Sequence, residues 1–289
     1  MMGNWNRAMG VLAVASCMGV AHGSEAFKSG GPYVPTPQVV VDRMLQFANV
    51  SEKDFVVDLG SGDGVIVLTA AKQFKASGMG IDIDADLIKM SNDKARKLDI
   101  ADRVGFVELD VFKADLSRAS VVTLYLLPGM MIDLRPKIFS ELKPGVRVVS
   151  HDYHFGDWAP DDRVTFDVPE KEKINGVPKA TVYLWYIPAK IAGGWQIKVD
   201  HGETYALTLK QRFQNIDASV AVGGRTLRPS QTELLGNDFS FVLSDTKGIA
   251  RFSGRVKDDV MEGTVVLPGA TAPARWTATR TAMAKVIAE

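Results

Sequence analysis

The segment DLGSGDG, residues 58–64, carries the pattern in this chain that is most informative about chemistry. Asp58 lies at the end of an apolar run, and Gly60, Gly62 and Gly64 follow at every second position. Glycine has no Cβ atom and readily adopts positive φ, so a ligand can lie directly against the backbone of such a turn. The segment therefore predicts a ligand-binding turn between a buried strand and a helix.

Two further aspartates come at the ends of the next two apolar runs. Asp82 lies in GMGIDI, and Asp110 follows VGFVEL. In an open parallel sheet, ligands bind at the carboxyl ends of the strands. At that edge Asp82 is placed to bind both hydroxyls of a ribose, and Asp110, with the backbone of Val111 beside it, an adenine amino group. Solvated strand ends are the alternative, but three aspartates in register with the glycines favour a nucleoside with an amino-acid-like tail.

The spacing of the glycines distinguishes two classes of nucleoside cofactor. Dinucleotide-binding folds use G-x-G-x-x-G and hold a pyrophosphate at the helix N-terminus. Here Gly64 comes one residue early, and Asp63 brings a negative charge to the place of the pyrophosphate. A sulfonium cation with an ammonium group suits this acidic turn better. The residues therefore favour S-adenosyl-L-methionine over NAD.

The chain resembles the class I S-adenosylmethionine-dependent methyltransferases. The resemblance rests on the order and spacing of DLGSGDGVIVLTAA, GIDIDADLI, VELDVF and LYLLPGMM. It is strongest for the branch containing the lysine methyltransferases of the ATP synthase c subunit, which shares a PYVP segment before the first helix and a RVVS strand. The similar region covers about residues 31–158. Val65 stands where that branch commonly has an arginine, and the C-terminal third has no counterpart in its pattern.

The resemblance implies that several residues hold S-adenosyl-L-methionine. They are Asp58, Gly60 and Gly62 at the methionine part, Asp82 at the ribose, Asp110 and Val111 at the adenine, and Tyr33 or Thr36 as a cover from the N-terminal segment. The cofactor expected is therefore S-adenosyl-L-methionine, and the expected activity is methyl transfer.

The ends of the fourth and fifth predicted strands carry side chains suited to an acceptor site. Methyl transfer from a sulfonium is an in-line displacement, and a lysine acceptor must first lose a proton. Tyr125 and His151 are the candidate catalytic residues, with Asp152, Tyr153 and His154 close in sequence, although strand-end packing explains each of them equally well. A His–Asp pair without a third ligand predicts no metal site.

The acceptor predicted is a protein lysine or another amine. The segment YLLP occupies the place of the Asn/Asp-Pro-Pro-aromatic tetrad of amide and adenine N-methyltransferases, which makes those acceptors less suitable. Basic and acidic residues balance at 34 each without a basic cluster, so no nucleic-acid surface is predicted. An exported scaffold, or a protein that binds an adenosyl compound without catalysis, is the alternative from another class.

The elements that must position these residues form two domains. From residue 38 to 189, apolar strand-like runs alternate with amphipathic helical stretches. This pattern predicts a doubly wound α/β domain with a mostly parallel seven-stranded sheet covered by helices on both faces. From residue 193 to 283, short alternating strands separated by turn residues predict a small antiparallel β domain, either a barrel or a sandwich. In it Trp195 is expected to pack against Arg275 or Arg280 rather than line a ligand cavity.

The N-terminal residues bear on location. Residues 1–23 combine a basic start, a short apolar run and small residues, the pattern of a signal peptide, and 24–37 form a linker. The protein is therefore expected to be exported, to the periplasm or beyond. Cys17, the chain's single cysteine, lies in VASC, which alternatively predicts lipidation and a membrane tether. An uncleaved leader on a protein that works in the cytosol is a further alternative.

Overall fold

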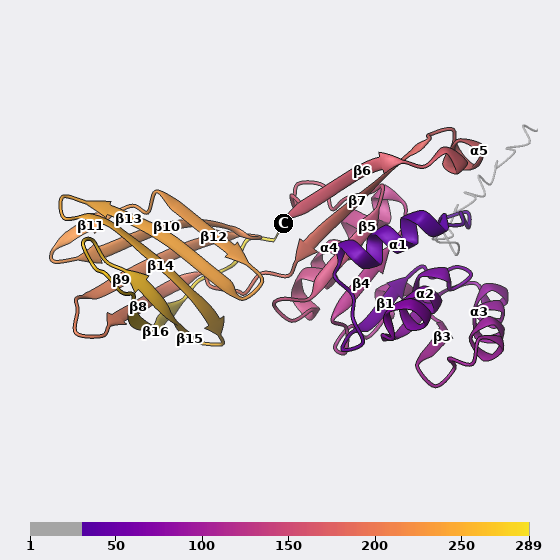
Figure 1. The fold of residues 1–289 in the computed structure, drawn as a ribbon, viewed down its shortest axis with the longest axis horizontal. Coiled ribbons are helices and arrows are strands. Elements are labelled where there is room, and N and C mark those ends of the chain that lie inside the picture. The colour runs from indigo at the N-terminus through magenta and orange to yellow at the C-terminus, as the bar shows by residue number, and fades with distance from the viewer. Residues whose placement is uncertain (1–30, 289) are drawn as a thin grey trace, which may run out of the picture.

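The computed structural model describes residues 31–288 and divides them between two sheets (Figure 1). A seven-stranded sheet has the order β3-β2-β1-β4-β5-β7-β6, and a nine-stranded sheet has the order β11-β10-β9-β8-β16-β15-β14-β13-β12. The predicted fold class, a mostly parallel α/β sheet followed by an antiparallel β domain, is confirmed. The predicted signal peptide, Cys17 and the first half of the predicted linker, residues 24–30, lie outside the described residues.

The first sheet holds five parallel strands and a terminal antiparallel hairpin in which β7 lies between β5 and β6. Its elements are α1 (Gln38–Phe47), β1 (Phe55–Leu59), α2 (Val65–Phe74), β2 (Ser77–Asp82), α3 (Ala85–Lys97), β3 (Val104–Glu108), the 3-10 helix η1 (Val111–Lys113), β4 (Val121–Leu124), α4 (Pro128–Glu141), β5 (Arg147–His151), β6 (Asp162–Asp167), the 3-10 helix η2 (Pro169–Lys171), α5 (Glu172–Asn175) and β7 (Lys179–Tyr186).

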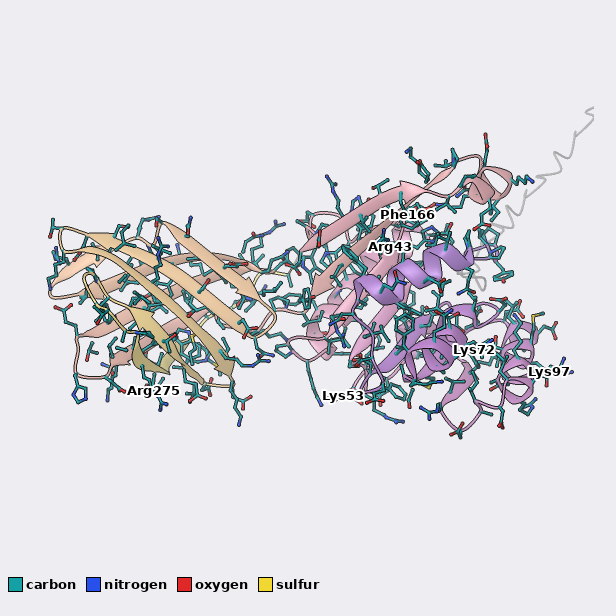
Figure 2. All side chains as sticks on the ribbon, viewed as in Figure 1. Arg43, Lys53, Lys72, Lys97, Phe166 and Arg275 are labelled. Atoms are coloured by element: carbon teal, nitrogen blue, oxygen red, sulfur yellow. The ribbon has the colours of Figure 1, made fainter. Side chains whose placement is uncertain are left out.

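Helices cover both faces of this sheet because its strands are apolar on both sides. Val56 of β1 belongs to the buried cluster formed with α1 and α2, whereas the next residue, Val57, belongs to the cluster formed with α4. At the edge of the sheet, Arg43 of α1 lies over the ring of Phe166 of β6, 5.5 Å from its centroid (Figure 2). The sheet that positions the carboxyl ends of β1 to β5 is therefore packed on both faces.

The second sheet curls until its two ends meet. Its strands are β8 (Gly193–Val199), β9 (Thr204–Arg212), β10 (Asn215–Val222), β11 (Arg225–Leu227), β12 (Gln231–Leu235), β13 (Asp238–Asp245), β14 (Gly248–Lys257), β15 (Val260–Val266) and β16 (Ala274–Met283). Thr232 of the end strand β12 donates a hydrogen bond of 2.9 Å to the carbonyl of Ile216 in β10, the strand next to the other end. Buried rings fill the interior, among them Trp195, Phe241 and Trp276.

The expected packing of Trp195 involves Arg280, whose guanidinium lies 4.2 Å from the ring centroid. Arg280 also donates to the carbonyls of Lys190 and Ala192, so it ties the start of the β domain to its last strand. Arg275, the other arginine considered, is exposed (Figure 2). The Trp–Arg contact is therefore a structural one at the base of the domain.

The β9–β10 turn anchors the β domain on the α/β domain. Phe213 is fully buried and stacks on Trp158, with ring centroids 5.3 Å apart and an interplanar angle of 6°. Gln214 accepts a 3.0 Å hydrogen bond from Nε1 of Trp158, and Arg212 forms an ion pair with Asp157. Because Asp157 and Trp158 lie in the loop after β5, the β domain contacts the loop that follows His151.

Three local features differ from the expected elements. The apolar run of residues 121–127 predicts a strand, but β4 ends at Leu124, so Tyr125 lies outside the sheet. The β6–β7 hairpin contains η2 and α5, which the sequence pattern does not reveal. The short strands β11 and β12 were also not expected, because neither is long enough to show clear alternation. Within residues 31–288, every helix is too short or too polar to cross a membrane.

Candidate functional site

The glycine turn after β1 has the geometry of a cradle. Gly60, Gly62 and Gly64 have φ values of 78°, 53° and 81°, which side-chain-bearing residues rarely adopt. A Cβ atom at Gly60 would lie 2.5 Å from Leu126 Cδ2, and one at Gly62 would lie 2.6 Å from Tyr33 Cε2. Glycine is therefore needed at both positions, as the sequence predicts for a turn that is approached closely.

Asp82 is attached to this turn. Its Oδ2 accepts a 2.8 Å hydrogen bond from the backbone amide of Gly62, and its Oδ1 accepts one of 3.0 Å from Asp84 N. Asp110 lies beyond the end of the neighbouring strand β3, where its Oδ1 accepts from Phe112 N at 3.0 Å and caps η1. Both carboxylates lie along the carboxyl edge, and their ribose and adenine roles stay predictions.

Asp58 lies beneath the turn and is 2% exposed. Its Oδ1 accepts a 2.6 Å hydrogen bond from Thr123 of β4. Burial raises the pKa of Asp58 to about 7, and the negative charges of Asp82 and Asp63 act in the same direction. The hydroxyl of Ser61, also buried in the turn, has no partner among the described residues. A cationic ligand with hydrogen-bonding groups fits these features, because it would favour the ionised form of Asp58.

The N-terminal segment covers the turn from above. The ring of Tyr33 lies against Gly62, and burial followed by the charge of Asp63 raises the pKa of its phenol to about 12. Thr36 is half-buried further along this segment. Asp63 in turn forms an ion pair of 2.6 Å with Lys94 of α3, a residue that sequence reasoning did not single out.

Val111 is 7% exposed and belongs to the core cluster around α4. Its side chain is therefore committed to packing. A contact with a ligand at this position would have to come from the backbone, as predicted from the sequence.

Tyr125 and His151 come together beside the turn. Tyr125 directly precedes Leu126, which contacts Gly60, and its ring centroid lies 4.0 Å from that of His151. Burial lowers the pKa of His151 to about 4, and burial followed by the charge of Asp152 raises the pKa of Tyr125 to about 12. Both side chains are therefore uncharged at neutral pH.

The three residues after His151 differ in whether they stay close to Tyr125 and His151. Tyr153 stays close, with its ring stacked 6.2 Å from that of Tyr125. His154 is exposed, and its Nδ1 accepts a 3.1 Å hydrogen bond from Gly156 N, so it does not join the cluster. Asp152 has a φ of 61°, which turns its carboxylate back toward His151 Nε2 at 3.3 Å.

Two members of this cluster were missed from the sequence. Lys171 forms an ion pair with Asp152, and Asn175 offers the Tyr125 phenol a side-chain hydrogen bond. Both come from the insertion in the β6–β7 hairpin, where PEKEKING reads as an exposed charged run. No local signal distinguishes Lys171 from Lys173, since only the folded hairpin buries one of them.

Known proteins similar to this chain include enzymes that methylate lysine. A family model described as the ANTKMT methyltransferase domain matches residues 58–162. A protein-lysine N-methyltransferase of Saccharolobus islandicus is 41% identical over 157 residues, which are 54% of this chain and 93% of that protein. A lysine N-methyltransferase of the ATP synthase c subunit, from Xenopus laevis, is 34% identical over 131 residues, 45% of this chain and 57% of that enzyme.

Among solved structures, an RNA methyltransferase from Salinibacter ruber in complex with S-adenosyl-L-homocysteine is similar. It is 50% identical, with a TM-score of 0.50, and the similarity covers 55% of this chain and 96% of that one. All these similarities leave much of the chain unmatched, since the longest of them covers little more than half of it.

Proposed function

The chain belongs to the S-adenosylmethionine-dependent protein-lysine methyltransferase family, and from this we propose that it methylates the side-chain amine of a lysine in a protein acceptor. The observation that carries the proposal is the position of Tyr125. The next residue, Leu126, contacts the glycine cradle, and Thr123, two residues earlier, binds the buried carboxylate of Asp58. The Tyr125 ring itself packs against the rings of His151 and Tyr153. An amine that reaches Tyr125 is next to the place where a cationic cofactor fits.

When bound, S-adenosyl-L-methionine supplies an electrophilic methyl group on a sulfonium. We propose that the cradle takes its methionine part, with the carboxylate of Asp58 ionised by the nearby positive charge. Asp82 is already fixed by Gly62 N and keeps acceptor capacity for the ribose hydroxyls, since a carboxylate has about four lone-pair sites. Tyr33, which is 47% exposed, would cover one side of the cradle, since its ring lies against Gly62.

The acceptor side works mainly by positioning. A protonated lysine cannot attack, so the amine must lose its proton to water before or as it enters the site. The Tyr125 hydroxyl can then hold the neutral amine in line, because its own high pKa keeps it a phenol. His151 is fully buried behind the Tyr125 ring, so we propose that it supports this ring rather than touches the acceptor.

RNA is the second candidate acceptor, because the Salinibacter ruber structure is that of an RNA methyltransferase. The balanced charge of this chain does not favour a polyanion, and no amide or adenine tetrad follows β4. We therefore place protein lysine first.

The proposed location is outside the cytosol, through cleavage after residue 23, with tethering through Cys17 as the variant. This proposal rests on residues 1–23 alone. Mass spectrometry of the native N-terminus tests it: a start at residue 24 supports export, a lipidated Cys17 supports tethering, and an intact leader contradicts both.

Two measurements test the function. Calorimetric titration with S-adenosyl-L-methionine and separately with NAD should show micromolar binding of the first alone. Incubation with methyl-labelled cofactor and fractionated cell protein or RNA should then label protein, with mass spectrometry placing the methyl group on lysine. Label in RNA alone would support the second candidate. Cofactor binding without any transfer would support a non-catalytic protein.

A further inference from the structure

The β6–β7 hairpin projects beyond the edge that carries the proposed site. His151, the last residue of β5, pairs with Val182, whereas β7 already begins at Lys179 and β6 ends at Asp167 opposite it. The hairpin therefore continues past the carboxyl end of β5. Figure 1 shows α5 at the tip of this hairpin. A side chain that is buried at the tip therefore lies on the acceptor side of the proposed site.

One charged side chain of the tip is buried there. Lys171 is 1% exposed, whereas its neighbours Glu170, Glu172 and Lys173 are exposed. Its Nζ forms an ion pair with Oδ2 of Asp152 and lies 3.2 Å from Nε2 of His151. The charged tip thus places a single buried ammonium group against His151 and Asp152.

Stability alone is a poor reason for this ion pair. Removing two charges from water costs several kcal/mol, and replacing a buried pair by apolar residues is often neutral or stabilising. Asp152 also adopts a left-handed φ of 61°. The other oxygen of Asp152 accepts a 3.0 Å hydrogen bond from Thr181 N, so the carboxylate is held in place even apart from Lys171.

The charge of Asp152 matters for the acceptor. Of the groups that face Tyr125, His151 and Tyr153 are aromatic neighbours, and Asp152 is the carboxylate that acts on its phenol. An uncompensated carboxylate within about 4–6 Å raises the pKa of an amine by about one to three units. It would therefore hold an incoming lysine as the unreactive ammonium ion.

We infer that Lys171 is a positioning residue that offsets the negative charge of Asp152, so that the acceptor site at Tyr125 receives its lysine as a free amine. The inference rests on the proposed function. The ammonium of the acceptor gives its proton to solvent water. The nitrogen lone pair then forms a bond to the methyl carbon while the carbon–sulfur bond breaks, and its electron pair stays on sulfur. The product carries the positive charge on its methylated nitrogen.

The pH dependence of kcat tests this role. In Lys171→Met the charge of Asp152 is no longer compensated, so the kcat profile should move to higher pH by about one to three units, with a loss of at least about tenfold at pH 7. The KM for the acceptor should stay the same or fall, because an ammonium ion still binds. Lys171→Arg should keep the wild-type profile.

Two further variants separate charge from structure. Lys171→Met with Asp152→Asn leaves a neutral pair of similar shape, and it should restore the wild-type pH profile. Lys179→Met removes an exposed ion pair with Asp167, where the two strands of the same hairpin meet its tip, and should change nothing. A kcat that falls equally at all pH values in Lys171→Met, or a double variant that is not restored, would overturn the inference.

Calorimetric titration with S-adenosyl-L-methionine confirms that each variant is folded. If Lys171→Met does not fold, the double variant decides: a pH profile unlike the wild type contradicts the role, and an unchanged profile supports it. Failure of the wild-type protein to transfer methyl groups would instead contradict the proposed function.

Discussion

The two domains differ in their buried polar side chains, which are common around the seven-stranded sheet and rare around the nine-stranded sheet. Of the buried polar and charged side chains in residues 31–288, only Gln211 belongs to the β domain, and the others, including Asp58, His151 and Lys171, belong to the α/β domain. Gln211 is fully satisfied: it donates to the carbonyls of Ala189 and Phe213 and accepts from Ile191 N. The β domain is thus built as an apolar core.

The α/β domain leaves polar groups unpaired where the β domain does not. Within the described part of the chain, the buried side-chain atoms without a partner are Ser61 Oγ, Arg135 Nε and His151 Nδ1. Each such group costs about 1–3 kcal/mol. Two of the three lie at the proposed cofactor and acceptor sites. This difference is consistent with the proposed cofactor and acceptor sites at the edge of the first sheet.

The strongest test of this comparison removes one carboxylate from each region. Asp82→Ala should weaken S-adenosyl-L-methionine binding by about 100-fold or more, because hydrogen bonds to a charged group contribute about 1.5–3 kcal/mol each. Asp245→Ala is the matched control, since Asp245 likewise accepts from a backbone amide, that of Lys247, at 2.8 Å. Calorimetric titration measures both. Retained affinity in Asp82→Ala would contradict the prediction that Asp82 binds the ribose hydroxyls.

A second test compares two buried phenylalanines. Phe213→Ala and Phe252→Ala should each destabilise the protein by about 3–5 kcal/mol, the usual range for a core phenylalanine. Only Phe213→Ala should also lower kcat of the folded protein, because Phe213 stacks on Trp158 in the loop that follows His151. Chemical denaturation and methyl-transfer assays measure the two effects. Equal kcat values would mean that the β domain has no influence on the site.

A third test uses the ionisation of Asp58. Since burial raises its pKa to about 7, the empty site holds it protonated below that pH, whereas a bound cation favours the carboxylate. Affinity for S-adenosyl-L-methionine should therefore increase by up to about tenfold per pH unit as the pH rises toward 7, and then level off. Calorimetry in buffers of different ionisation enthalpy should show proton release at pH 6. Asp58→Asn should abolish both effects.

The raised pKa of Asp58 has the opposite effect on the stability of the cofactor-free protein, which it lowers as the pH rises. The unfolded carboxyl ionises near pH 3.9, whereas folded Asp58 resists ionisation until about pH 7. The unfolded state therefore binds fewer protons between these values, and the contribution of Asp58 lowers stability as the pH rises. Thermal unfolding of wild type and Asp58→Asn should converge at low pH and diverge toward pH 7.

The smallest effects are expected for exposed ion pairs in either region. Asp167→Asn breaks the pair with Lys179, and Asp238→Asn breaks the pair with Arg255; all four side chains are largely exposed. Each change should shift the Tm by less than about 2 °C, because surface pairs contribute little. A larger shift in only one region would show that surface electrostatics stabilise that region more than the other.

Much of this architecture could be predicted from short stretches of sequence. The strands β1 to β5 are nearly continuous apolar runs, and the glycines of residues 60–64 reveal a turn because glycine adopts positive φ values far more readily than other residues. Asp58, Asp82 and Asp110 could be assigned to one edge because parallel strands bring their carboxyl ends together. These signals are local: they depend on residue type and spacing along a single segment.

Contacts between distant segments were decided only by the tertiary structure. Lys171 and Asp152 meet because the β6–β7 hairpin overshoots β5, and Phe213 reaches Trp158 because the β9–β10 turn docks on the loop after β5. Arg280 rather than Arg275 covers Trp195 because strand pairing places it opposite that residue. Residue types and periodicity specify which face of an element is buried. Which charged side chain is buried with it depends on how the elements are joined and packed in space.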